Sequence, residues 1–109
     1  MTTFQLTTWD RVMIASAVGA LRGDVKLMRK AGKLLDVIEL TPDEREAVNF
    51  KYDEAHGFAA WEQQDRRWDV TIADPEMLVL LKETLSGKSD WPAVQNKQVI
   101  ALYEALGIE

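Results

Sequence analysis

The chain has 109 residues, of which 47% are hydrophobic and 28% are charged, and a formal net charge of −5. This size and composition indicate a single globular domain over residues 1–109 and exclude a disordered chain. The absence of cysteine excludes disulfides and thiolate metal sites, and the acidic balance opposes general phosphate binding.

The first residues, MTTFQLTTWDRVM, lack both the basic start and the continuous apolar stretch of a secretory signal. The longest apolar run is far shorter than a membrane-spanning helix requires. We therefore expect a cytoplasmic protein that has no membrane partner.

Two helices are predicted in the first third of the chain. The first covers about residues 9–21, with Thr7 or Thr8 as its cap and a face of small residues that would let a neighbouring helix come close. Gly23 is expected to close it in the left-handed region, and Asp24 to cap a second helix over about residues 25–37. The apolar stripe of the second helix contains Leu27, Met28, Ala31, Leu34, Leu35 and Ile38.

The side of the second helix opposite this stripe is basic, with Lys26, Arg29, Lys30 and Lys33. One interpretation is an ordinary solvated face, and the other is a patch that docks an anion or an acidic partner. Residues 36–54 are mainly acidic, so a basic and an acidic surface are both expected on the molecule.

A short helical turn and three strands are predicted next. Thr41, Pro42 and Glu44 form a capping-box start. Alternating apolar residues then predict strands over about residues 48–53, 58–63 and 67–72. Because the connections between these strands are short, we expect a three-stranded antiparallel meander.

Two further helices complete the predicted fold. Asp74 and Pro75 start one of them, which Gly87 ends, and the other covers about residues 93–106 after a start at Ser89 or Asp90 with Pro92. The predicted class is α+β, a three-stranded antiparallel meander packed against about four helices in the order ααβββαα.

Enzymatic chemistry has little support in the sequence. His56 is the sole histidine and lies beside Gly57, so a solvated turn explains it better than a catalytic base or a zinc ligand. Glu62, Asp65 and Asp69 are the best carboxylate candidates, but a ribbon offers no cleft, and Glu62 with Arg66 or Arg67 suggests exposed cross-strand pairs. The serines lack a nucleophile motif, and no nucleotide-binding loop is present. We expect no enzyme activity, no metal and no cofactor.

Trp61 is the most informative of the four tryptophans. If Phe50, Phe58 and Trp68 face the helices, strand alternation leaves Trp61 on the outside. It would then be either covered by a loop or helix, or exposed as a binding anchor beside Arg66 and Arg67.

Three stretches carry a resemblance: LRGDVKLMRKAGKLLDVIELTPDEREAVNFK, then WEQQDRRWDVTIADPEMLVLLKETL, then VIALYEALGI. The order of these elements resembles a group of short, uncharacterised phage and prophage proteins. SGKSDWPAVQNK differs from the Lys/Glu-rich connector that is usual there. The resemblance implies an accessory protein of the host cytoplasm and brings no active site with it.

We expect a non-catalytic protein-binding module that acts on a host or viral protein of unknown identity. Two surfaces are predicted to bind it: the basic side of the second helix, with Lys26, Arg29, Lys30 and Lys33, and the ribbon surface of Trp61, Arg66 and Arg67. A ribbon edge can also pair with a second copy to form a homodimer. The alternatives are nucleic-acid binding through the second helix, which the net charge opposes, and a structural or assembly role in a virion.

Overall fold

The computed structural model describes residues 2–53, 55 and 58–108, and its helices and strands form an α+β fold. Its described part contains five α-helices, a 3-10 turn and two small antiparallel sheets. In chain order the elements are β1 (Thr2–Thr7), α1 (Thr8–Gly19), α2 (Val25–Ile38), α3 (Pro42–Ala47), β2 (Lys51–Asp53), β3 (Phe58–Ala60), β4 (Arg67–Ile72), α4 (Pro75–Ser86), η1 (Ala93–Gln95) and α5 (Asn96–Leu106).

The larger sheet pairs β1 with β4, from Thr2 opposite Ile72 to Thr7 opposite Arg67. Phe4 and Leu6 are buried on β1, while the residues between them are exposed, which is the alternation of a half-buried strand. The sequence did not predict β1, so the predicted three-stranded meander is wrong. β4 has the predicted bounds, but it pairs with β1 and not with β3.

The smaller sheet is the hairpin of β2 and β3, with Lys51 opposite Ala60. Both strands are shorter than predicted. Val48 ends α3 and Asn49 has a positive φ of 50°, so extended backbone cannot start before Phe50. The predictions on His56 and on the side chain of Phe58 lie outside the described residues.

The helix starts follow the predicted caps closely. The side chains of Thr7, Asp24, Thr41 and Asp74 each accept a backbone N–H of the first turn that follows. Helix α1 ends at Gly19 and not at residue 21. Gly23 does not close it in the left-handed region; it leaves room for Leu27, whose side chain a Cβ at this position would meet at 2.5 Å.

The last helix starts later than predicted and without help from Ser89 or Asp90. Pro92 precedes the 3-10 turn, no side chain caps it, and the α-helix begins only at Asn96. Asp90 instead pairs with Lys88 at 2.7 Å. The helix ends at Gly107, whose φ of 71° is the left-handed conformation that glycine adopts most readily.

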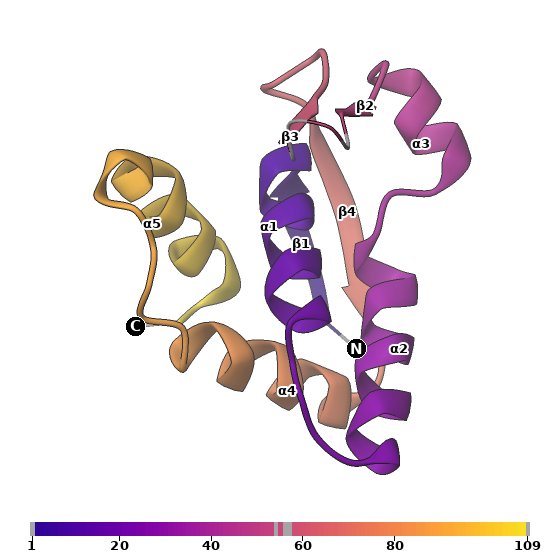
Figure 1. The fold of residues 1–109 in the computed structure, drawn as a ribbon, viewed down its shortest axis with the longest axis vertical. Coiled ribbons are helices and arrows are strands. Elements are labelled where there is room, and N and C mark those ends of the chain that lie inside the picture. Colours follow the sequence, from indigo (N-terminus) through magenta and orange to yellow (C-terminus); the bar gives the residue numbers. More distant parts are fainter. Residues whose placement is uncertain (1, 54, 56–57, 109) are drawn as a thin grey trace.

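The core lies between the β1–β4 sheet and the helices around it. Figure 1 shows α1 in front of this sheet, α2 to the right, α4 across the bottom and α5 to the left. The fully buried side chains come from every layer and include Leu6, Ile14, Leu34, Leu81 and Leu102. Among the described helices, none combines the length and apolar character needed to span a membrane.

Candidate functional site

The basic side of α2 lies mostly in solvent, as predicted. Lys26, Arg29 and Lys33 are exposed, while Lys30 is half-buried and forms an ion pair with Glu76 on α4 at 3.5 Å. The opposite side of the helix contributes Ala31, Leu34 and Ile38 to the core. Met28 is an exception, because it is exposed and does not widen the apolar stripe.

Among the described residues, no hydrogen bond or cation–ring contact joins Arg66 or Arg67 to Trp61. Arg66 lies over the ring of Trp68, with its Cζ atom 4.1 Å from the ring centroid. Arg67 is exposed on β4 opposite Thr7. Neither arginine pairs with Glu62, which among the described contacts accepts a hydrogen bond from Asn49 at 3.5 Å, so the predicted cross-strand pairs are wrong.

Trp61 is half-buried and stacks on Phe50, with the ring centroids 5.8 Å apart and the planes at 11°. The arrangement considered from the sequence, with Phe50 facing the helices and Trp61 on the outside, is therefore not the one in the structure. β3 ends at Ala60, so the alternation of a strand does not extend to Trp61. The Nε1 atom of Trp61 is buried and has no hydrogen-bond partner among the described residues.

The three carboxylate candidates of the ribbon, Glu62, Asp65 and Asp69, are all exposed. Within the described part of the chain, no group of three or more histidine, aspartate or glutamate side chains is placed to hold a metal ion.

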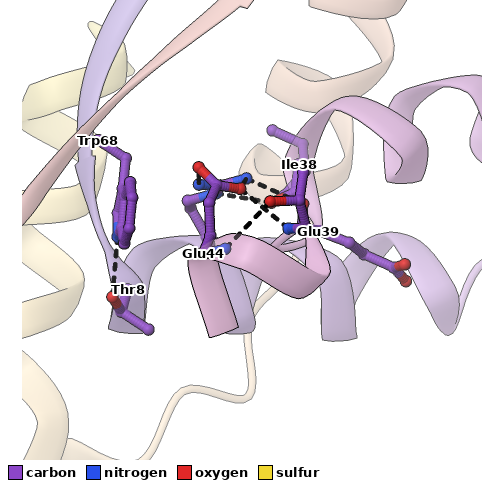
Figure 2. Close-up of polar contacts among 7 residues, drawn as sticks. Thr8, Ile38, Glu39, Glu44 and Trp68 are labelled. Carbon is purple, nitrogen blue, oxygen red and sulfur yellow. Dashed lines mark hydrogen bonds and ion pairs between the residues drawn. The ribbon is translucent and has the colours of Figure 1, made fainter. Parts of the chain in front are cut away.

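The most connected polar side chain is Arg11, which is only 4% exposed. Its Nε donates to the carbonyl oxygen of Ile38 at 2.8 Å and its Nη2 to that of Glu39 at 2.9 Å. Nη1 and Nη2 also hold the carboxylate of Glu44 at 2.9 and 3.1 Å. Figure 2 shows Glu44 beside Ile38 and Glu39, and its dashed lines include the hydrogen bonds that Arg11 donates to these three residues. The arginine fastens α1 to the end of α2 and the start of α3.

The contacts of Glu44 determine its ionisation. Burial opposes the charged form, but the hydrogen bonds from Arg11 and from the backbone N–H of Thr41 outweigh it and hold the pKa of Glu44 below its usual value. The carboxylate of Glu44 therefore has a structural role. No sequence motif indicated that Arg11 would be its partner.

A matched pair of tryptophan substitutions tests the polar contacts of the two rings. Trp68 Nε1 donates to the buried hydroxyl of Thr8 at 3.0 Å (Figure 2), whereas Trp61 Nε1 has no acceptor among the described residues. We expect Trp68→Phe to lower the free energy of unfolding by about 1–3 kcal/mol more than Trp61→Phe, because only the former leaves a buried hydroxyl unpaired. Chemical denaturation of both variants measures the difference, and equal losses would contradict the assignment.

The outward face of α1 carries no charged side chain, although part of it is exposed. No charged residue occurs between Arg11 and Arg22. The inward face contains the buried Ile14 and Val18, yet the opposite face, at helical spacing, is also apolar or small and consists of Trp9, Val12, Met13, Ser16, Gly19 and Ala20. A helix that is apolar all round is normally buried, whereas this one keeps Ser16, Gly19 and Ala20 exposed.

Three adjoining cavities run along this face of α1. One of about 640 Å³ lies between α1 and the β2–β3 hairpin, and one of about 430 Å³ lies between α1 and the segment that joins α4 to α5. Both are lined by Met13 and Ser16. A smaller cavity of about 120 Å³ shares Val12, Ala15 and Glu39 with the largest one. We call this set of cavities the α1 groove.

Of the seven predicted binding residues, only Trp61 lines the α1 groove. The four basic residues lie on α2 outside its lining, and Arg66 and Arg67 lie near or on β4. Ten uncharged residues between Arg11 and Arg22 indicate this groove in the sequence, but we expected their small side chains to pack against a neighbouring helix.

Comparison with protein-family models, with curated proteins and with solved structures gave no match to this chain. The geometry and chemistry of these residues are therefore the basis for a functional assignment.

Proposed function

We propose that this chain is a non-catalytic protein-binding module that docks a segment of another protein in the α1 groove. The observation that carries the proposal is the uncharged, partly exposed outward face of α1. Large apolar surfaces that stay in contact with water are unfavourable, and a partner that covers them gains the free energy of removing them from water.

The shape of the groove favours an elongated partner. Its cavities follow one helix and are bordered by aromatic side chains, with Trp61 and Tyr52 on one side and Trp91 on the other. Aromatic residues are common among the residues that dominate protein interfaces. A peptide segment or a helix of the partner fits such a surface better than a flat protein face does.

The experiment that tests the proposal uses two serine positions. Ser16 is exposed at the centre of the groove, and Ser86 is exposed at the end of α4, outside the groove lining. A partner is captured from a cell lysate with the tagged wild-type chain, identified, purified and titrated by calorimetry. We expect Ser16→Arg to weaken binding by at least tenfold, because its long charged side chain would occupy the space in which the partner docks, and Ser86→Arg to leave binding unchanged.

Equal affinity of the wild type and of Ser16→Arg for the purified partner would overturn the proposal. Circular dichroism of both variants establishes that they are folded; since both positions are exposed, neither change is expected to alter stability by more than about 0.5 kcal/mol.

Nucleic-acid binding through α2 is the second candidate, and it is supported by Lys26, Arg29 and Lys33, which are exposed and have no ion-pair partner among the described residues. The variant Lys26→Glu/Lys33→Glu tests it without disturbing the ion pair of Lys30. If the wild type binds nucleic acid, and if this binding is lost in the variant and falls steeply with salt, nucleic-acid binding through α2 would be favoured over protein docking in the α1 groove.

The resemblance to short phage and prophage proteins supports an accessory role, in which the module occupies a host or viral protein. A stable dimer would fit that role. Assembly into larger particles in light scattering would instead favour a virion component.

A further inference from the structure

The largest cavity of the α1 groove combines aromatic rings with a negative charge. It is lined by Trp9, Val12, Met13, Glu39, Tyr52 and Trp61, together with small residues. Among the lining residues that the structure describes, only Glu39 is charged. Tyr52 is 61% exposed at its rim, and Trp9 and Trp61 are half-buried.

Each of the two tryptophans belongs to an aromatic pair that extends away from the cavity. Trp61 stacks on Phe50, and Trp9 lies against Trp91 with ring centroids 6.3 Å apart. In each pair, the ring that does not line this cavity, Phe50 or Trp91, already has a cation of the chain over it. Arg45 lies 5.4 Å from the Phe50 centroid, and the Nζ atom of Lys88 lies 4.8 Å from that of Trp91.

The ring of each pair that lines the cavity has no such cation among the described residues. The cations placed over rings are Arg45 at Phe50, Lys88 at Trp91, and Arg11 and Arg66 at Trp68. Trp9 and Trp61 both line the cavity, and no cation of the described residues lies over either ring.

The carboxylate of Glu39 is also uncommitted in the described contacts. Its backbone carbonyl accepts a hydrogen bond from Arg11, and its backbone N–H donates to Leu35 at 2.8 Å. Its side chain has no ion pair or hydrogen bond among the described residues. Where a carboxylate and aromatic rings line the same cavity, both attract a cation: the carboxylate through its charge, and the rings through their negative faces.

We infer that this cavity binds the basic side chain, arginine or lysine, of the docked partner. The inference rests on the proposed function and names the chemistry of its partner. The alkyl part of such a side chain would contact Val12 and Met13, and its charged end would lie near Glu39 and the tryptophan faces. Anionic groups are opposed by Glu39, and a purely apolar group would leave this carboxylate covered without a partner.

Short peptides serve as probes of the cavity. Ac-Gly-Arg-Gly-NH2 is compared with Ac-Gly-citrulline-Gly-NH2, which has nearly the same shape but no charge. Each is titrated into the ¹⁵N-labelled chain while the indole N–H signals of the four tryptophans are followed by NMR. We expect the arginine peptide to shift the signals of Trp9 and Trp61 and to bind at least threefold more tightly than the citrulline peptide.

A glutamate substitution provides the second arm of the test. We expect Glu39→Gln to remove the preference for the charged peptide, whereas Glu104→Gln, at an exposed position on α5, should leave it unchanged. Equal affinities of the two peptides for the wild type, or a preference that survives Glu39→Gln, would overturn the inference.

The outcomes separate this inference from the function on which it rests. A purified partner that is sensitive to Ser16→Arg but indifferent to Glu39→Gln would retain the groove as the docking surface and reject the basic side chain. Binding of the arginine peptide through Glu39, together with a partner unaffected by Ser16→Arg, would retain the cation site and reject groove docking.

Discussion

Replacing Arg11 with methionine is expected to lower the free energy of unfolding by about 3–5 kcal/mol. Methionine fills much of the space of the arginine side chain but donates no hydrogen bonds. The carbonyl oxygens of Ile38 and Glu39 would lose the hydrogen bonds from Arg11, and the carboxylate of Glu44 would keep only the N–H of Thr41. Urea denaturation followed by tryptophan fluorescence measures the loss, and Arg22→Met, at an exposed position, is the control.

The cost of Arg11→Met is also expected to depend on pH. Because the folded-state pKa of Glu44 is lowered, its ionised form stabilises the fold above the unfolded-state pKa of about 4.3, and this contribution is lost as the pH falls through the lowered value. The difference between wild type and variant should therefore shrink in acid. It should not vanish, since the bonds to the two carbonyl groups do not titrate. A constant difference from pH 7 to pH 3 would contradict the role of Glu44.

Leu6→Ala is expected to have the second large effect, a loss of about 2–5 kcal/mol in the free energy of unfolding. Leu6 has no exposed surface, and it lies on β1 opposite Trp68. Truncation leaves a cavity between the sheet and the helices that cover it, and a close-packed interior closes such a cavity only in part.

The neighbouring Gln5 supplies the matched control for this measurement. It lies on the same strand with its side chain exposed, so Gln5→Ala is expected to change stability by less than about 0.5 kcal/mol. If both substitutions cost the same small amount, β1 would not be part of the folded sheet, and the prediction that β4 stands in a meander with β2 and β3 would have to be reconsidered.

The local signals in this sequence were the reliable ones. The caps at Thr7, Asp24, Thr41 and Asp74 depend on hydrogen bonds to backbone groups two or three residues away, so the sequence holds all the information they need. The bounds of β4 were correct for the same reason, since its alternation is complete within six residues.

The pairing of the strands could not be derived from such signals. Nothing local distinguishes a β4 that joins the nearby β3 from one that joins β1, and the preference for short connections favoured the wrong partner. The two apolar residues of β1, Phe4 and Leu6, stand directly before a helix cap, and a pattern this short was missed.

The surface that we propose for binding contains only one of the residues that the sequence singled out. Trp61 lines the largest cavity of the α1 groove, but strand alternation does not place it there, because β3 ends at Ala60. The small residues of α1 were expected to receive a neighbouring helix. The tertiary arrangement decides which side of a helix with two apolar faces stays uncovered. Here α2, α4 and β1 pack against α1, and no described element covers Ser16 and Ala20.

The pairing of β1 with β4 also sets the timing of folding during synthesis. The first strand leaves the ribosome early, but the strand that completes its sheet is encoded about 60 residues later, which at 5–20 residues per second is an interval of roughly 3–12 seconds. Until β4 has been synthesised, the apolar side chains of β1 lack the strand that pairs with them, and transiently exposed apolar surface of this kind favours association with other chains.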